Sequence, residues 1–282
     1  MMPSMVAARG RNRGGGGTGS SNLHKIAGGR IHSAGLKSDG TVITAGSNAS
    51  GQRNTITWAG IISVACGDDF TVGLKGDGTV LTTGLVNASG LTDIISVAAG
   101  SNFVLGLKSD GTVVAVGPST SVTQSAVSGW TNIVYISGCY QSVLGVLSDG
   151  IVVGAGDNSS GQLNVANWSD IILAANNRFG SAGALTTGTV IGAGNASYFP
   201  VGWTDIVGIA GGWYQTIGLK SNGTVLPVGS NFAGQLNVDG WTNIIEVASG
   251  EAQSIGLKDD GSVIGVGRNT SGQLDFTGWN LL

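Results

Sequence analysis

The chain has 282 residues, a formal net charge of −3 and 51 glycines, yet only 10% of its residues are charged. So low a charge content is the opposite of the signature of disorder, and the glycines follow no three-residue period, which excludes a collagen-like chain. No apolar run approaches the roughly 20 residues of a membrane-spanning helix, and none follows the first arginines as it would in a secretory signal. We therefore expect a folded, turn-rich chain without a signal peptide or a transmembrane segment. We also expect no membrane partner.

The first 21 residues differ in composition from the rest of the chain. Arg9, Arg11 and Arg13 are the only charges before Lys25, and small residues and glycines surround them. Such a segment has too few apolar residues to bury a core of its own. We predict a flexible, basic, glycine-rich arm over residues 1–21, whose three arginines are candidates for binding a protein partner. Nucleic acid ranks second as their target, because three arginines give weak affinity and a shallow salt dependence.

From residue 22 onward one pattern occurs seven times. The segment Gly-Leu-Lys-Ser-Asp-Gly-Thr-Val at residues 35–42 returns in six further copies, with its turn glycine at positions 40, 78, 111, 150, 188, 223 and 261. An Asp-Gly or Asn-Gly pair between two apolar runs predicts a β-hairpin, because the turn needs positive φ. The fifth copy has Thr187-Gly188 there, a weaker form of the same signal. A period this regular indicates one supersecondary unit repeated along the chain.

Two more segments complete each unit. Gly-Trp-Thr-Asn-Ile-Ile at residues 240–245 predicts a strand preceded by a tryptophan, and Asn-Thr-Ser-Gly-Gln-Leu at residues 269–274 predicts a turn after the last strand. Residues 22–35 match the segment that leads into every other hairpin, and the chain stops at residues 278–282, where the next such segment would begin. We predict an all-β, seven-bladed β-propeller over residues 22–282, closed by pairing of the N- and C-terminal segments. An open β-solenoid is the alternative, but it would need atypical capping repeats.

These segments together resemble the regulator of chromosome condensation family. The resemblance covers residues 22–282 and is carried by Val-Ala-Ser-Gly at 247–250, Leu-Lys-Asp-Asp-Gly at 257–261 and the Asn-x-x-Gly-Gln-Leu turn. It implies a repeat β-propeller. The best-known family member is a nuclear exchange factor for a small GTPase that also holds chromatin, so the resemblance implies exchange activity by analogy of fold alone. The repeats here are shorter, have no long insertion to act as an exchange wedge, and look like bacterial or phage repeats.

The sequence offers no catalytic constellation. The two histidines, His24 and His32, match no cysteine, serine or carboxylate at a recognisable spacing, and Cys66 and Cys139 fall at different repeat positions. The recurrent aspartates lie in hairpin turns, where Asp bonds its own backbone. Six tryptophans share one repeat position, which favours packing between blades over a ligand-stacking row: 58, 130, 168, 203, 241 and 279. We expect a non-enzymatic protein with no cofactor and no metal.

The candidate binding residues are those that break the repeat. One pair of positions differs in every unit: 30–31, 68–69, 101–102, 140–141, 178–179, 213–214 and 251–252. A position that the fold does not dictate is where a specific surface can be encoded, and we expect all seven pairs on one rim. The candidates for contact with a partner are Tyr140, Arg178, Phe179, Trp213 and Tyr214.

These features favour a structural or attachment scaffold. Our first hypothesis is a virion component, such as a phage capsid decoration, fibre or tail protein, whose partners are capsid or tail proteins. The alternative is a carbohydrate- or protein-binding module on a bacterial surface, using the same aromatic residues. Small-GTPase exchange is the third hypothesis, supported by fold analogy only.

Overall fold

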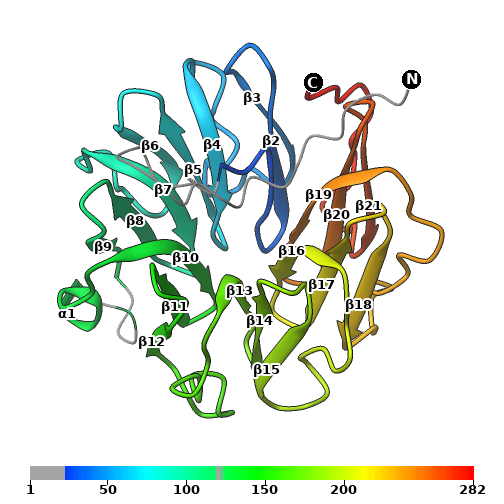
Figure 1. The fold of residues 1–282 in the computed structure, drawn as a ribbon. Helices are drawn as coiled ribbons and strands as arrows, with labels where there is room; N and C mark the ends of the chain where they lie inside the picture. Colours follow the sequence, from blue (N-terminus) through cyan, green and yellow to red (C-terminus); the bar gives the residue numbers. More distant parts are fainter. Residues whose placement is uncertain (1–22, 119–121, 123) are drawn as a thin grey trace, which may run out of the picture.

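The computed structural model describes residues 23–118, 122 and 124–282, and it confirms the all-β prediction. Seven antiparallel three-stranded sheets follow one another around a ring (Figure 1). The blades are β1 (Ile26–Gly28), β2 (His32–Leu36) and β3 (Val42–Gly46); β4 (Ile61–Cys66), β5 (Phe70–Lys75) and β6 (Val80–Gly84); β7 (Ile94–Ala99), β8 (Val104–Lys108) and β9 (Val113–Val116); β10 (Ile133–Cys139), β11 (Ser142–Leu147) and β12 (Val152–Gly156); β13 (Ile171–Asn176), β14 (Gly180–Leu185) and β15 (Val190–Gly194); β16 (Ile206–Gly211), β17 (Gln215–Lys220) and β18 (Val225–Gly229); and β19 (Ile244–Ser249), β20 (Gln253–Lys258) and β21 (Val263–Gly267).

The described residues also contain one single-turn helix, α1 (Gln124–Val127). No helix in the described part of the chain is long and apolar enough to cross a membrane. The predicted arm at residues 1–21, with Arg9, Arg11 and Arg13, lies outside the described residues.

The turn between the second and third strand of each blade is the predicted hairpin turn, with Asp-Gly in five blades, Thr-Gly in the fifth blade and Asn-Gly in the sixth. In the first blade Gly40 has φ of 79°, and the Asp39 carboxylate accepts hydrogen bonds from the Thr41 N–H at 2.9 Å and its hydroxyl at 2.6 Å. The same pattern of turn bonds holds at Asp77, Asp110 and Asp260. The aspartates therefore serve the turn, as the sequence predicts.

Because each blade is an antiparallel meander, two of its loops emerge at the same end. The turn between the first and second strand lies there, and so does the segment that leaves the third strand. In the sixth blade Gln215 pairs with Gly229, and the Ser230 N–H donates to the Tyr214 carbonyl at 2.8 Å. We call this end of the ring the loop face. The Asp-Gly turns lie at the opposite end of the blades.

The shared tryptophan position packs between blades, as predicted. Trp58 lies in one buried cluster with Ala34 and Leu36 of the first blade and Ile61 of the second. A Cβ atom at Gly73 would lie 2.7 Å from the Trp58 ring, so the middle strand needs glycine there. The tryptophan position thus accounts for the glycine that recurs in the repeat.

The last segment of the chain contacts the first blade. The Trp279 ring lies against Gly35, and Leu281 is buried in one cluster with Ile26. The Lys25 ammonium donates to the Leu281 carbonyl at 2.8 Å. Each described sheet consists of three consecutive strands, so the predicted pairing of the terminal segments as strands is not among the described ladders.

Candidate binding site on the loop face

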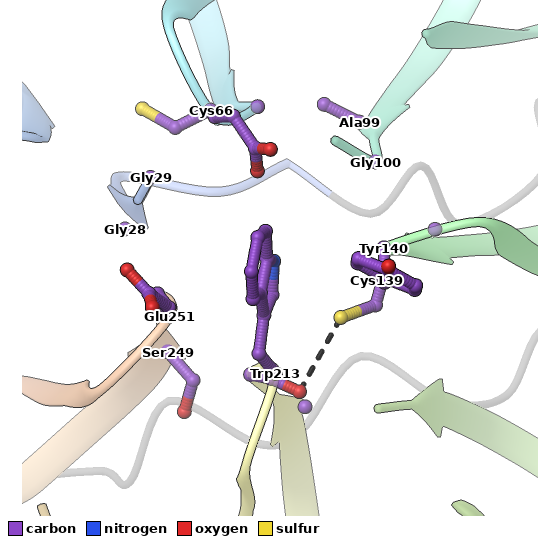
Figure 2. A pocket seen from close by; sticks show the side chains of 16 residues that line it. Gly28, Gly29, Cys66, Ala99, Gly100, Cys139, Tyr140, Trp213, Ser249 and Glu251 are labelled. Atoms are coloured by element: carbon purple, nitrogen blue, oxygen red, sulfur yellow. Dashed lines mark hydrogen bonds between the residues drawn. The ribbon is translucent and has the colours of Figure 1, made fainter. Parts of the chain in front are cut away.

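The first strands of all seven blades line a central channel, and the seven divergent pairs lie around its mouth on the loop face. Each pair lies in the turn between the first and second strands of its blade, so the expectation of a common rim agrees with their placement. Backbone hydrogen bonds between turns hold them at N···O distances of 2.9–3.3 Å: Asp68 to Ser101, Ser101 to Tyr140, Arg178 to Trp213, Trp213 to Gly250 and Glu251 to Gly29. In six of the blades, the ends of the first strands and the turns that follow them line an open hollow that we call the channel mouth (Figure 2).

Trp213 projects into the channel mouth. Its ring meets Tyr140 edge to face, with centroids 5.0 Å apart and an interplanar angle of 73°. Figure 2 shows Trp213 between Tyr140 on one side and Glu251 on the other. Asp68 also lines the hollow. The mouth therefore combines aromatic surface with carboxylates.

Trp213 also belongs to a wider group of rings, which we call the aromatic cluster. Its members contact one another across the fourth, fifth and sixth blades: Tyr140, Phe179, Tyr198, Trp213, Tyr214 and Phe232. Tyr214 lies at its centre, with its ring centroid 6.1 Å from that of Phe179, 6.3 Å from Trp213 and 5.2 Å from Phe232. Phe232 is 58% exposed, so the cluster has an open edge on the loop face.

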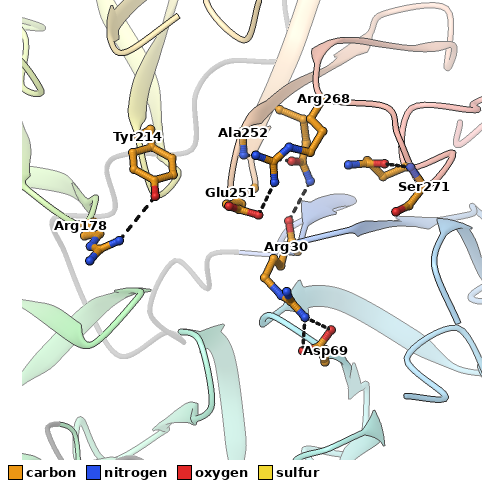
Figure 3. Close-up of polar contacts among 12 residues, drawn as sticks. Arg30, Asp69, Arg178, Tyr214, Glu251, Ala252, Arg268 and Ser271 are labelled. Atoms are coloured by element: carbon orange, nitrogen blue, oxygen red, sulfur yellow. Dashed lines mark hydrogen bonds and ion pairs between the residues drawn. The ribbon is translucent and has the colours of Figure 1, made fainter. Parts of the chain in front are cut away.

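Two arginines stack on these rings. The Arg178 guanidinium lies 4.5 Å from the Tyr140 centroid and 5.2 Å from that of Phe179, and it donates to the Tyr214 hydroxyl at 3.5 Å (Figure 3). The Arg268 guanidinium lies 5.7 Å from the Phe232 centroid. The aromatic cluster therefore presents apolar rings and positive charge on one surface.

Most charges at the rim are paired. Arg30 forms an ion pair with Asp69 at 2.7 Å, and Arg268 forms one with Glu251 at 2.8 Å (Figure 3). No cation in the described residues lies within ion-pairing distance of Asp68. Burial raises the pKa of Asp68 to about 7; nearby Ser101 and Arg30 lower it, whereas the charges of Asp69 and Glu251 raise it further.

The structure brings together all five candidates that the sequence suggested within the described residues: Tyr140, Arg178, Phe179, Trp213 and Tyr214. Sequence reasoning missed Tyr198, Phe232 and Arg268, which lie in the segments after the third strands. A signal was available for Phe232, since the other copies of its Asn-x-x-Gly-Gln turn have Ala49, Ser159 or Thr270 at that position. Arg9, Arg11 and Arg13 lie outside the described residues, so their placement is not part of this site.

The thiols do not add a reactive group to this site. Cys66 and Cys139 are both free. Burial raises the pKa of Cys66 to about 12 and raises that of Cys139 as well. Both thiols are therefore protonated at neutral pH and poor nucleophiles. In the described part of the chain, no group of three or more His, Cys, Asp and Glu side chains is arranged to hold a metal ion.

Comparisons with known proteins agree on the fold. Residues 61–90 match the model of the regulator of chromosome condensation (RCC1) repeat, and no curated protein sequence matches the chain. The CRINKLY WD40 ectodomain of the Arabidopsis thaliana receptor kinase ACR4 is 18% identical, with a TM-score of 0.70 over 87% of this chain and 97% of that one. Prp20p from Saccharomyces cerevisiae is 15% identical, with a TM-score of 0.65 over 80% of each chain. The C-terminal domain of gp131 from bacteriophage phiKZ is 11% identical, with a TM-score of 0.54 over 92% and 96%. At these identities the likeness concerns the fold alone.

Proposed function

Because this chain is an RCC1-like repeat β-propeller, we propose that it is a non-enzymatic scaffold that attaches to a protein partner through the aromatic cluster of its loop face. The observation that carries this proposal is the cluster itself, in which six rings contact one another and two arginines stack on them. Aromatic residues and arginine are the residue types enriched at the energetic centres of protein interfaces. The other repeats have different residues at the equivalent positions, so the fold does not require these rings.

We further propose that the partner is a capsid or tail protein and that the chain is a virion component. Two observations support this. The arm at residues 1–21 carries Arg9, Arg11 and Arg13 without neighbouring acidic residues, which suits contact with a second chain. The fold is similar to that of a bacteriophage phiKZ protein domain. Protein binding also occurs on this fold, since Prp20p binds Gsp1p and histones.

The ring of blades is closed, in this proposal, by docking of the last segment onto the first blade. Trp279, Leu281 and the Gln273 carbonyl, which accepts a hydrogen bond from Ser33 at 2.8 Å, support this closure. They occupy the places that Trp58 and the Gln52 carbonyl occupy between the first two blades. A closed ring gives the loop face a fixed shape, as a docking surface requires.

Carbohydrate binding at a bacterial surface is the second candidate function. The open ring of Phe232 favours it, since an exposed aromatic face can stack on a sugar ring. Both candidates use the aromatic cluster, so the identity of the bound molecule distinguishes them.

The test combines a cluster variant with a matched control. Phe232→Ser with Tyr214→Ala removes the open edge and the centre of the aromatic cluster. Leu85→Ser is the control, because Leu85 is 70% exposed and follows the third strand of the second blade, away from the cluster. In the native host we expect wild type and the control to sediment with particles, and the double variant to remain free while still folded. Incorporation of the double variant at the wild-type level would contradict the proposal. Glycan binding that the double variant loses would instead support the second candidate.

A further inference from the structure

We propose that the channel mouth binds the ammonium group of a lysine side chain from the protein partner, held between the Trp213 ring and the carboxylates of Asp68 and Glu251. This inference rests on the proposed function, because it assumes a protein partner on the loop face. The channel mouth lies on the same face as the aromatic cluster, and the cluster by itself gives this hollow no ligand.

The lining of the channel mouth is suited to a cation. Among the described residues that line it, the charged ones are Asp68 and Glu251, and both are acidic. Much of the remaining wall is glycine and alanine backbone, which leaves room for a narrow chain. Trp213 supplies an aromatic face with Glu251 on one side of it (Figure 2). An ammonium near an aromatic face is attracted by the ring quadrupole, and more strongly where water is partly excluded.

The pairing of charges leaves one carboxylate free for the ligand. Arg30 donates to both carboxylate oxygens of Asp69, whereas Arg268 donates to Oε2 of Glu251, so that Oε1 of Glu251 can still accept from a ligand. Asp68 has no such partner in the described residues, although it is partly buried beside two other acidic groups. A bound ammonium would supply the missing counter-charge and would add charge-assisted hydrogen bonds to carboxylate oxygens.

The site should prefer a primary ammonium over other cations. A primary ammonium has three N–H donors, and the carboxylates can accept them. A trimethylammonium has no N–H donor, so it would supply Asp68 with a counter-charge but with no hydrogen bond. A guanidinium is wider and planar, and it is suited to stacking, as Arg178 stacks on Tyr140 outside the mouth.

Binding should also depend on pH. The pKa of Asp68 is about 7 in the free protein, so this carboxyl is largely protonated at pH 5.5 and ionised at pH 8. The groups that face it are Ser101, the ion-paired Arg30 and Asp69, Glu251 and the neutral thiol of Cys139. Lysine keeps its charge across this range, since its pKa is about 10.4. Affinity should therefore rise between pH 5.5 and pH 8.

The experiment follows the indole N–H signals of the tryptophans by NMR while Nα-acetyl-lysine N-methylamide is added to the full-length protein. Trp213→Phe identifies the Trp213 signal. We expect that signal to shift, Asp68→Asn to weaken binding at least tenfold, and Asp110→Asn, which changes an exposed turn carboxylate, to leave it unchanged. The norleucine analogue, which lacks the ammonium, and the trimethyl-lysine analogue should bind more weakly.

Several results would overturn the inference: no shift of the Trp213 signal, equal binding of the norleucine analogue, or unchanged affinity in Asp68→Asn. Tighter binding of a free diamine than of the lysine derivative would overturn the assignment to a protein side chain. Failure here is distinct from failure of the proposed function, because particle incorporation is tested separately through Tyr214 and Phe232, which do not line the channel mouth.

Discussion

At the scale of single residues, repeated and divergent positions have different physical causes. The recurrent glycine of the middle strand is imposed by packing, since a Cβ atom would lie 2.4 Å from Trp203 at Gly218 and 2.9 Å from Trp241 at Gly256. The divergent pair in the turn between the first and second strands has no such recurrent residue, and its first member is as different as Arg30 and Trp213. The fold therefore fixes the first kind of position and leaves the second free to vary.

The fifth blade offers a test of the turn chemistry. Its turn has Thr187, whose hydroxyl lies 3.5 Å from the Thr189 N–H, where Asp110 accepts the equivalent bond from Thr112 at 2.9 Å. We expect Thr187→Asp to stabilise the protein slightly and Asp110→Thr to destabilise it by a similar amount, measured by urea unfolding at pH 7. Hydrogen bonds from Thr112 lower the pKa of Asp110. The gain should therefore be complete above the unfolded pKa of about 3.9 and disappear as pH falls through the lower folded value. A gain that persists after protonation would contradict this origin.

Because of His32, the free energy of unfolding should decrease as the pH is lowered. Burial lowers the pKa of His32 to about 4, and its Nε2 lies 3.0 Å from the Thr71 hydroxyl. The unfolded chain protonates this histidine below about pH 6.5 and the folded chain does not, so stability falls from pH 6.5 to pH 4 at roughly 1.4 kcal/mol per pH unit. Gln215 and Gln253 occupy the same place at the start of β17 and β20.

His32→Gln should therefore fold at pH 7 and gain roughly 2.5 kcal/mol over wild type on going to pH 4.5. The readout is the difference in unfolding free energy between variant and wild type at each pH, measured with denaturant. This difference cancels the contribution of Asp68, which has the opposite sign because its pKa is raised in the folded protein. Gln253→His is the reciprocal variant and should acquire the acid sensitivity. Parallel pH profiles for His32→Gln and wild type would contradict the role of burial.

At the scale of the element, the repeat made the blades predictable. Alternating apolar runs and the Asp-Gly turn locate the second and third strands, and the segment after the tryptophan locates the first. The short helix α1 follows no repeat feature and was not expected. Tyr198 and Phe232 were missed because their contacts with Phe179 and Tyr214 depend on which segment returns beside which turn. The three-dimensional path of the meander sets which segments lie side by side, and the spacing of residues along the chain does not reveal it.

The contact between the last segment and the first blade gives a quantitative prediction about this element. Trp279 is 6% exposed and packs on Gly35, as Trp241, 8% exposed, packs on Gly256. If the ring is closed, Trp279→Ala and Trp241→Ala should each cost roughly 3–5 kcal/mol of unfolding free energy, as large-to-small changes of buried tryptophan do. Denaturant unfolding with both variants in parallel measures this. A much smaller loss for Trp279→Ala would mean that the first and last blades separate readily.

At the scale of the whole molecule, the ring has two unlike ends. One end carries the Asp-Gly turns, which repeat from blade to blade and bond their own backbone. The other carries the channel mouth and the aromatic cluster, which occupy only part of the ring. The propeller, the common rim and the five candidate residues that the structure brings together followed from the repeat and its exceptions. That Asp68 has no ion-pair partner among the described residues could not be foreseen, because it depends on Arg30 pairing with Asp69 and Arg268 with Glu251.

The propeller should fold without the N-terminal arm. Residues 1–21 contain none of the seven repeats, and the described sheets begin at Ile26, so deletion of residues 1–21 should leave a folded propeller. In our proposal Arg9, Arg11 and Arg13 bind a neighbouring chain of the virion, so the truncated protein should no longer join its particle, as judged by sedimentation. Changing the three arginines to glutamine in the full-length chain is the matched control for length, and it should have the same effect. Normal incorporation of both proteins would show that attachment depends on the propeller alone.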